Sequence, residues 1–323
     1  MDQVATIEQI KALIRAHLEI DDQKFRTIVL QIAAHEAKVG HTTNAREIKD
    51  IIQNPKYFNK NKVIPLNNQL DILEHKLTNL NLADLVVSED IEEKIKRIIN
   101  EYFKKEILRK NGLLNRHKIL LAGDPGTGKT MTASVIANEL YLPLYVIRLD
   151  RLITKYMGET SVKLRQVFDQ IKEIRGVYLF DEFDAIGSDR SLDNDVGEMR
   201  RILNSLLQNI EDDESYSIII AATNNPNILD KALFRRFDDV IEYKNPNKEQ
   251  IVRLLKMKLS GRASDEIFAD DVYKMALELN HADIVKACED AVKYSILEES
   301  VITKDIMINY LQDRKDRYRY KEA

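Results

Sequence analysis

The sequence has a single cysteine and no tryptophan among its 323 residues. Cys288 therefore excludes an internal disulfide, and because it falls in a helical pattern we expect a small buried side chain there. Glycine (10 residues) and proline (6 residues) are scarce, so no long flexible linker is expected. No apolar run approaches the roughly 20 residues that span a bilayer, and the N-terminus lacks a basic, apolar leader. We therefore expect a cytoplasmic protein that makes no contact with a membrane.

Neither sign of charge is in large excess. Charged residues make up 32% of the chain, but the net charge is only −4, which gives no general attraction to nucleic acid. Apolar residues make up 44%, and at this length the chain is expected to form two or three globular domains that expose charged helices.

Residues 1–78 show apolar residues at helical spacing. One stripe runs through 7–18, and a second has the spacing of an amphipathic helix: Phe25, Ile28, Val29, Ile32 and Ala33. A capping pair predicts a third helix over 44–51, the asparagine-rich stretch 54–68 predicts a loop, and 69–79 predicts a further helix. Since the segment carries no enzyme motif, we expect a helical recognition domain.

From residue 79 onward, short apolar runs alternate with helical patterns, which is typical of a parallel sheet with crossover helices. Five buried strands are predicted: Lys118–Ala122, Leu144–Leu149, Val177–Phe180, Ser217–Ala222 and Val240–Tyr243. After residue 247 only helices are predicted. The expected domains are a helical one (1–78), an α/β domain with a five-stranded parallel sheet (79–246), and a smaller helical one (247–323).

A glycine-rich motif follows the first predicted strand. Gly123-Asp124-Pro125-Gly126-Thr127-Gly128-Lys129-Thr130 matches G-x-x-x-x-G-K-[ST] at every fixed position, and Met131 begins an amphipathic helix. Such a loop turns backbone N–H groups toward one point, and the helix N-terminus adds partial positive charge. The motif predicts a phosphate cradle in which Lys129 contacts the β- and γ-phosphates of ATP and Thr130 is a ligand of Mg²⁺.

Polar residues follow two more of the predicted strands. Asp181 and Glu182 come directly after 177–180, and we expect Asp181 to hold Mg²⁺ and Glu182 to polarise the attacking water. Thr223 and Asn224 follow the strand at 217–222. The amide of Asn224 can position water against the γ-phosphate, although such a pair also opens ordinary turns.

The order of these motifs resembles the AAA family of ATPases over residues 80–300. The likeness continues through Leu229-Asp230-Lys231-Ala232-Leu233-Phe234-Arg235-Arg236-Phe237-Asp238, and more narrowly it points to the katanin, spastin and Vps4-like members. The resemblance implies that Asn224 is the first sensor, that Arg235 and Arg236 are arginine fingers acting on ATP bound by a neighbouring subunit, and that the chain forms a ring, usually a hexamer. This sequence lacks the Pro-Gly that separates the two arginines in many members. A salt-bridged surface turn is the alternative role for the pair.

The same resemblance implies a pocket for the adenine base. Val86 and Val87 occupy the segment before the α/β core that forms this pocket in relatives, and Ala282 belongs to the helical domain that covers it. His281 stands where the family's Gly-Ala-Asp segment has glycine. A helix-cap histidine is the alternative explanation for this residue.

Two further likenesses concern what the ATPase acts on. Lys155, Tyr156 and Met157 resemble the family's pore loop, in which an aromatic ring and a thioether grip a polypeptide by apolar contact. The N-terminal helices resemble the adaptor domains of Vps4-like proteins, and also the N-terminal region of bacterial AAA proteins encoded beside subtilisin-like serine proteases. A protein substrate, or a partner such as a subtilisin-like protease, is therefore expected.

Three functions follow from the sequence. The first is ATP-driven remodelling or threading of a protein. The second is an ATP-dependent assembly switch, or a regulator of a partner protein, with little threading. The third is a DNA-linked ATPase, which the acidic balance and the lack of a DNA-binding pattern disfavour.

Overall fold

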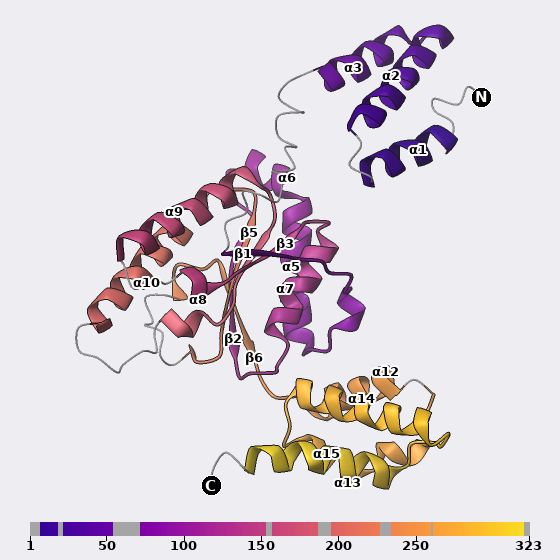
Figure 1. Cartoon of the computed structure of the whole chain (residues 1–323), viewed down its shortest axis with the longest axis vertical. Coiled ribbons are helices and arrows are strands. Elements are labelled where there is room, and N and C mark those ends of the chain that lie inside the picture. The colour runs from indigo at the N-terminus through magenta and orange to yellow at the C-terminus, as the bar shows by residue number, and fades with distance from the viewer. Residues whose placement is uncertain are drawn as a thin grey trace. The chain divides into compact units, whose positions relative to one another are not determined.

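The structure, a computed structural model, describes residues 7–18, 22–53, 72–152, 157–186, 195–226, 234–259 and 261–319. The chain divides into two compact units, residues 1–69 and 70–323, and each is described here by itself (Figure 1).

The described residues of the first unit form three helices: α1 (Ile7–Leu18), α2 (Asp22–Val39) and α3 (Thr42–Gln53). All three contribute apolar side chains to its small core: Ala12, Leu13, Ala16, Phe25, Ile28, Ile32 and Ile48. Gly40 follows α2 with a φ of +100°, a left-handed conformation that favours glycine and ends a helix. The prediction of three amphipathic helices in this part of the chain is confirmed.

The second unit is built on a six-stranded sheet with the strand order β1-β3-β4-β5-β2-β6. The five predicted strands are present and parallel: β2 (Lys118–Gly123), β3 (Leu144–Ile147), β4 (Val177–Phe180), β5 (Ile218–Thr223) and β6 (Asp239–Tyr243). The strand β2 lies between β5 and β6, with Leu121 opposite Ala222 and Ile241. Its side chains are buried on both faces, which explains the unbroken apolar run in the sequence.

The sixth strand departs from the sequence-based prediction. The prediction of a helix over 69–79 is wrong, because β1 (Leu73–Lys76) lies in this range and pairs antiparallel with β3. Only Leu73 of its four residues is buried, so the sequence has no alternating apolar pattern from which this strand could be predicted. The strand forms because the edge of β3 offers backbone N–H and C=O groups that need partners.

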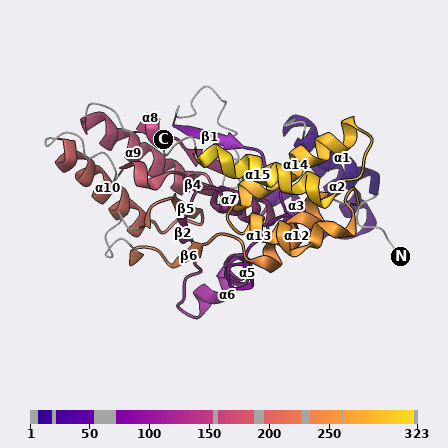
Figure 2. The same cartoon turned by 90° about the horizontal axis from the view of Figure 1, so that it is seen from below.

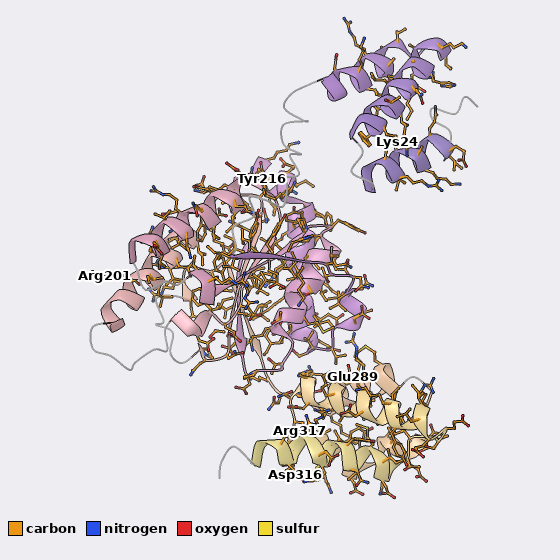
Figure 3. The ribbon with its side chains drawn as sticks, viewed as in Figure 1. Lys24, Arg201, Tyr216, Glu289, Asp316 and Arg317 are labelled. Atoms are coloured by element: carbon orange, nitrogen blue, oxygen red, sulfur yellow. The ribbon has the colours of Figure 1, made fainter. Side chains whose placement is uncertain are left out.

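Helices cover both faces of the sheet (Figures 1 and 2). One face packs against α5 (Glu89–Phe103) and α7 (Lys129–Glu139), with α6 (Lys105–Lys110) following α5. The other packs against α8 (Leu149–Leu152), α9 (Met157–Glu173) and α10 (Asp195–Glu211). Two single 3-10 turns belong to this region: η2 (Leu82–Asp84) and η3 (Phe183–Ile186). Side chains crowd the space between the sheet and the helices (Figure 3), so the sheet has a separate apolar core on each face.

The helices after the sheet form a third core of this unit. They are α12 (Lys248–Leu259), α13 (Asp270–Ala276), α14 (His281–Leu297) and α15 (Lys304–Arg319), with a 3-10 turn, η5 (Asp265–Phe268), before α13. Val86, from the segment that precedes α5, is 4% exposed and packs into this core. We call this group of helices the lid.

Tyr243 joins β6 to α7, and its removal should be measurable. Its hydroxyl group lies 2.6 Å from the hydroxyl group of Thr132, and both residues are buried. In Tyr243→Phe the hydroxyl group of Thr132 still donates its hydrogen bond to the carbonyl oxygen of Gly128 (3.1 Å), so the substitution leaves no buried donor without an acceptor. We expect the substitution to lower the free energy of unfolding by about 1 kcal/mol, seen as a lower urea midpoint. In the control, Tyr141→Phe, the ring is 89% exposed and the midpoint should not move; equal midpoints for both variants would contradict this packing.

Candidate active site

The glycine-rich loop joins the end of β2 to the first turn of α7, at the carboxyl edge of the sheet. Gly126 and Gly128 have φ values of +77° and +107°, and Gly128 is the residue that precedes α7 as its N-cap. A Cβ atom on Gly126 would lie 2.6 Å from the side-chain oxygen of Asn280. The loop therefore needs glycine both for its backbone conformation and for a close approach by the lid.

The ammonium group of Lys129 is held over this loop. It donates hydrogen bonds to the carbonyl oxygens of Gly123 (2.7 Å) and Asp124 (2.8 Å). Lys129 is 6% exposed, and burial lowers the pKa of its ammonium group, against the opposing effect of Asp181, Asp184 and Asp124. A cation held in this way is placed to meet an anion that enters the loop.

Thr130 and Asp181 meet although they come from different loops. The Thr130 hydroxyl donates to the Asp181 carboxylate over 2.9 Å. The other carboxylate oxygen of Asp181 accepts a hydrogen bond from the backbone N–H of Glu182 (3.0 Å). Glu182 itself has a φ of +53°, an unusual conformation for a residue with a side chain, and is exposed. Its carboxylate is thus available in the cavity beside the Thr130–Asp181 pair.

Asn224 lies at the end of β5, between β4 and β2, and an unpredicted residue fixes its position. The carboxylate of Asp184 accepts hydrogen bonds from the backbone N–H of Asn224 (3.0 Å) and from the hydroxyl of Thr223 (3.2 Å). Asp184 comes three residues after Asp181, a spacing that the sequence shows without revealing its partner. The half-buried Asn224 faces the same cavity as Glu182.

These elements enclose a cavity of about 460 Å³, which we call the nucleotide cavity. Most of the predicted binding residues line it: Val86, Pro125, Gly126, Thr127, Gly128, Lys129, Thr130, Met131, Asp181, Glu182, Asn224 and Ala282. Asp84 and Leu85, which precede Val86 in the segment expected at the base, and His281, which precedes Ala282, line it too. Four further lining residues were not predicted: Leu254, Met257, Lys258 and Val285. Asp124 contributes its carbonyl to Lys129 and to the Thr127 hydroxyl (2.7 Å), and Val87 lines a neighbouring cavity instead.

The lid is bonded directly to the phosphate loop. The backbone N–H of Ala282 donates to the carbonyl of Gly126 over 2.9 Å. Asn280 is the N-cap of α14, because its side chain accepts from the N–H of Asp283 (2.9 Å). His281 is therefore the first residue of the helix, and the helix-cap explanation for it is wrong.

The two arginines lie outside this cavity. Arg235 and Arg236 sit between Phe234 and Phe237, which pack against the core of the α9–α10 face. Arg235 is exposed, whereas Arg236 is partly buried with its Nε 3.5 Å from the carboxylate of Glu211. The two neighbouring guanidinium groups thus have different surroundings.

The predicted pore loop falls largely outside the described residues. This holds for Lys155 and Tyr156, and Met157 is the first residue of α9. The structure therefore leaves the pore-loop assignment as a prediction.

The residues around the nucleotide cavity fit ATP with Mg²⁺. Thr130 and Asp181 offer hard oxygen ligands beside the phosphate loop, which suit a magnesium ion that keeps several water ligands and binds phosphate oxygens. In the described ranges, no group of three or more His, Cys, Asp or Glu residues could hold a metal ion.

A glycine-rich loop between a central parallel strand and its helix, opposite an acidic pair at the same sheet edge, defines a P-loop nucleoside triphosphatase. Residues 119–245 match the sequence profile of the "ATPase family associated with various cellular activities (AAA)". The chain is 33% identical over 285 residues to an uncharacterized AAA family ATPase, y4kL, of Sinorhizobium fredii, and the match covers 86% of each chain. The chain belongs to the AAA family and is an ATPase.

Other relatives match the ATPase part. The chain is 35% identical over 209 residues to the proteasome-activating nucleotidase of Methanococcus vannielii, covering 62% of this chain and 51% of that one. The crystal structure of the FIGL-1 AAA domain shares the fold, with a TM-score of 0.59 and 19% identity over 78% of this chain and 91% of that chain. Within the described ranges, every helix is too short or too polar to cross a membrane.

His281 should make folding stability depend on pH. Burial lowers the pKa of its imidazole to about 4, whereas the unfolded chain has a value of about 6.5. Between these values the unfolded state binds a proton that the folded state does not, so this stabilisation is complete above pH ~6.5 and lost as the pH falls toward ~4. We expect wild-type protein to lose more stability than His281→Phe between about pH 7 and pH 5 in urea titrations. Parallel losses in the two proteins would contradict a neutral, buried His281.

Proposed function

We propose that identical subunits assemble into a ring in which ATP bound by one subunit is hydrolysed with an arginine from the next, and that the ring remodels or threads a protein. One observation carries this proposal. The nucleotide cavity contains Glu182 and Asn224, whereas neither Arg235 nor Arg236 lines it. Phosphoryl transfer needs positive charge on the transferring group, and an exposed arginine outside its own cavity can supply that charge to a neighbour.

The described residues have complementary roles in this proposal. Lys129 and the loop N–H groups hold the phosphates, while Thr130 and Asp181 hold Mg²⁺, which neutralises charge on the phosphate oxygens. Glu182 accepts the proton of the attacking water, and the Asn224 amide orients that water. The hydrogen bonds of Asp184 keep Asn224 at the required place.

Arg235 is the better candidate for the finger, because Arg236 is engaged by Glu211 within its own chain. We expect Arg235→Ala to lower turnover by about 10³-fold or more. Arg236→Ala should act mainly on stability, because its partner lies on the same subunit. ATPase rates and urea midpoints of both variants separate the two effects.

Whether the arginine acts on the neighbouring subunit is tested by mixing two inactive variants. Arg235→Ala subunits keep an intact cavity, and Lys129→Ala subunits keep an intact arginine, so mixing them should restore part of the turnover. No recovery at any mixing ratio would refute a finger supplied by the neighbour.

Remodelling is supported by the resemblance of residues 155–157 to a pore loop and by relatives named as proteasome-activating nucleotidases. We expect Tyr156→Ala to spare ATP hydrolysis and to abolish ATP-dependent unfolding of a protein substrate, measured with a fluorescent reporter protein. Tyr156→Phe, which keeps the aromatic ring, is the matched control. Unfolding that survives Tyr156→Ala would favour the second candidate, an ATP-dependent assembly switch that regulates a partner.

Finer features complete the proposal. They are a hexameric ring, a place among the katanin, spastin and Vps4-like members, and three functional domains. The boundary predicted at residue 78 moves to about residue 70, because β1 (Leu73–Lys76) belongs to the sheet, and the boundary at residue 246 is kept. The first domain would recognise the substrate or a partner, for which a subtilisin-like protease is our candidate. Its small apolar core and three helices suit recognition better than chemistry.

A further inference from the structure

His281 lies where two cavities meet. It is 8% exposed, and it lines both the nucleotide cavity and the neighbouring cavity of about 500 Å³. The neighbouring cavity is formed by residues at the start of α5, by β6 and by the connection to the lid. An imidazole ring in this position forms part of the wall of the nucleotide cavity.

Both ring nitrogens of His281 are buried, and neither has a hydrogen-bond partner in the part of the chain that the structure describes. Burial lowers the pKa of the ring to about 4, so near neutral pH one nitrogen is a donor and the other an acceptor. Leaving such groups unpaired costs about 1–3 kcal/mol each, and folded proteins rarely do so. A polar group of a ligand in the cavity would remove this cost.

The walls of the nucleotide cavity show which part of the ligand this is. Lys129, Thr130 and Asp181 line part of the cavity and suit phosphates and a metal ion. The remaining walls include four apolar residues, Val86, Leu254, Ala282 and Val285. His281 adjoins Ala282, whose N–H is bonded to the loop. The charged residues Asp84 and Lys258 line the cavity as well. Largely apolar walls that carry a few polar groups are the surroundings that hold a heterocyclic base and orient its edge.

We infer that His281 binds the base of the nucleotide, with its neutral imidazole hydrogen-bonded to the edge of adenine. Adenine presents an amino donor and ring-nitrogen acceptors, and a neutral imidazole can match either kind. The inference deepens the proposed function, because it takes nucleotide binding in this cavity as given. It assigns to this side chain an affinity for the base that glycine at the same position cannot supply.

The test compares ATP with ribose triphosphate, which has the sugar and phosphates of ATP but no base. Binding is measured by calorimetry on proteins that all carry Glu182→Gln, so that ATP is not consumed. His281→Phe keeps a ring of similar size without its nitrogens, and we expect ATP to bind about tenfold more weakly, which corresponds to the loss of one hydrogen bond. The affinity for ribose triphosphate should not change.

Further variants keep the inference testable. His281→Gly serves as the second variant if His281→Phe does not fold, and it should show the same selective loss. His281→Asn, which has a donor and an acceptor, should recover part of the affinity for ATP. The control is His75→Phe on β1, an exposed histidine away from both cavities.

Each other outcome overturns the inference. Unchanged ATP affinity in the variants would show that His281 only fills space. An equal loss for both ligands would place the contact at the sugar or phosphates instead of the base. Failure of the Glu182→Gln protein with native His281 to bind either ligand would refute the nucleotide site itself, a result distinct from the other two.

Discussion

The hydrogen bond between Thr130 and Asp181 is the interaction on which the active site depends. It joins the first turn of α7, the helix that follows β2, to the residue after β4, and β2 and β4 are not neighbours in the sheet. Between them lies β5, which brings Asn224 to the same place. The carboxyl ends of parallel strands share one edge of a sheet, so three loops far apart in the sequence must meet there. The buried cores on both faces of the sheet keep these strand ends in register.

A second constraint couples this edge to the lid. Val86 lies between β1 and α5 in sequence but packs among the lid helices, and the N–H of Ala282 is bonded to the carbonyl of Gly126. One loop therefore leads into the N-terminus of α7 and also carries the acceptor for the first turn of α14. Because a backbone hydrogen bond joins this loop to the first turn of α14, a rearrangement of the loop would also act on the lid.

The sequence predicted most of this site because its residues lie in short motifs. The glycine loop, Asp181 and Glu182 each follow a strong apolar run, and their chemistry is recognisable without coordinates. The features that the sequence did not predict have physical reasons. The strand β1 is a four-residue edge with one buried side chain, so it has no periodic pattern. Asp184 acts through the backbone of Asn224, which is 40 residues away. Val86 and Val87 are adjacent, yet they pack into different cores.

The sequence by itself determined the class of chemistry, since a glycine-rich loop, the threonine after its lysine and an acidic pair need only local spacing and a strand before each. It also determined the parallel sheet, because strands buried on both faces must be apolar throughout. Only the tertiary structure decided how side chains of the same type differ. Arg236 meets Glu211 while the adjacent Arg235 is exposed. His281 is buried with no hydrogen-bond partner among the described residues, while His75 is exposed. The burial of a side chain and its bonding partners are set by residues distant in the chain. They determine whether an arginine is free to contact another molecule and whether an imidazole stays neutral.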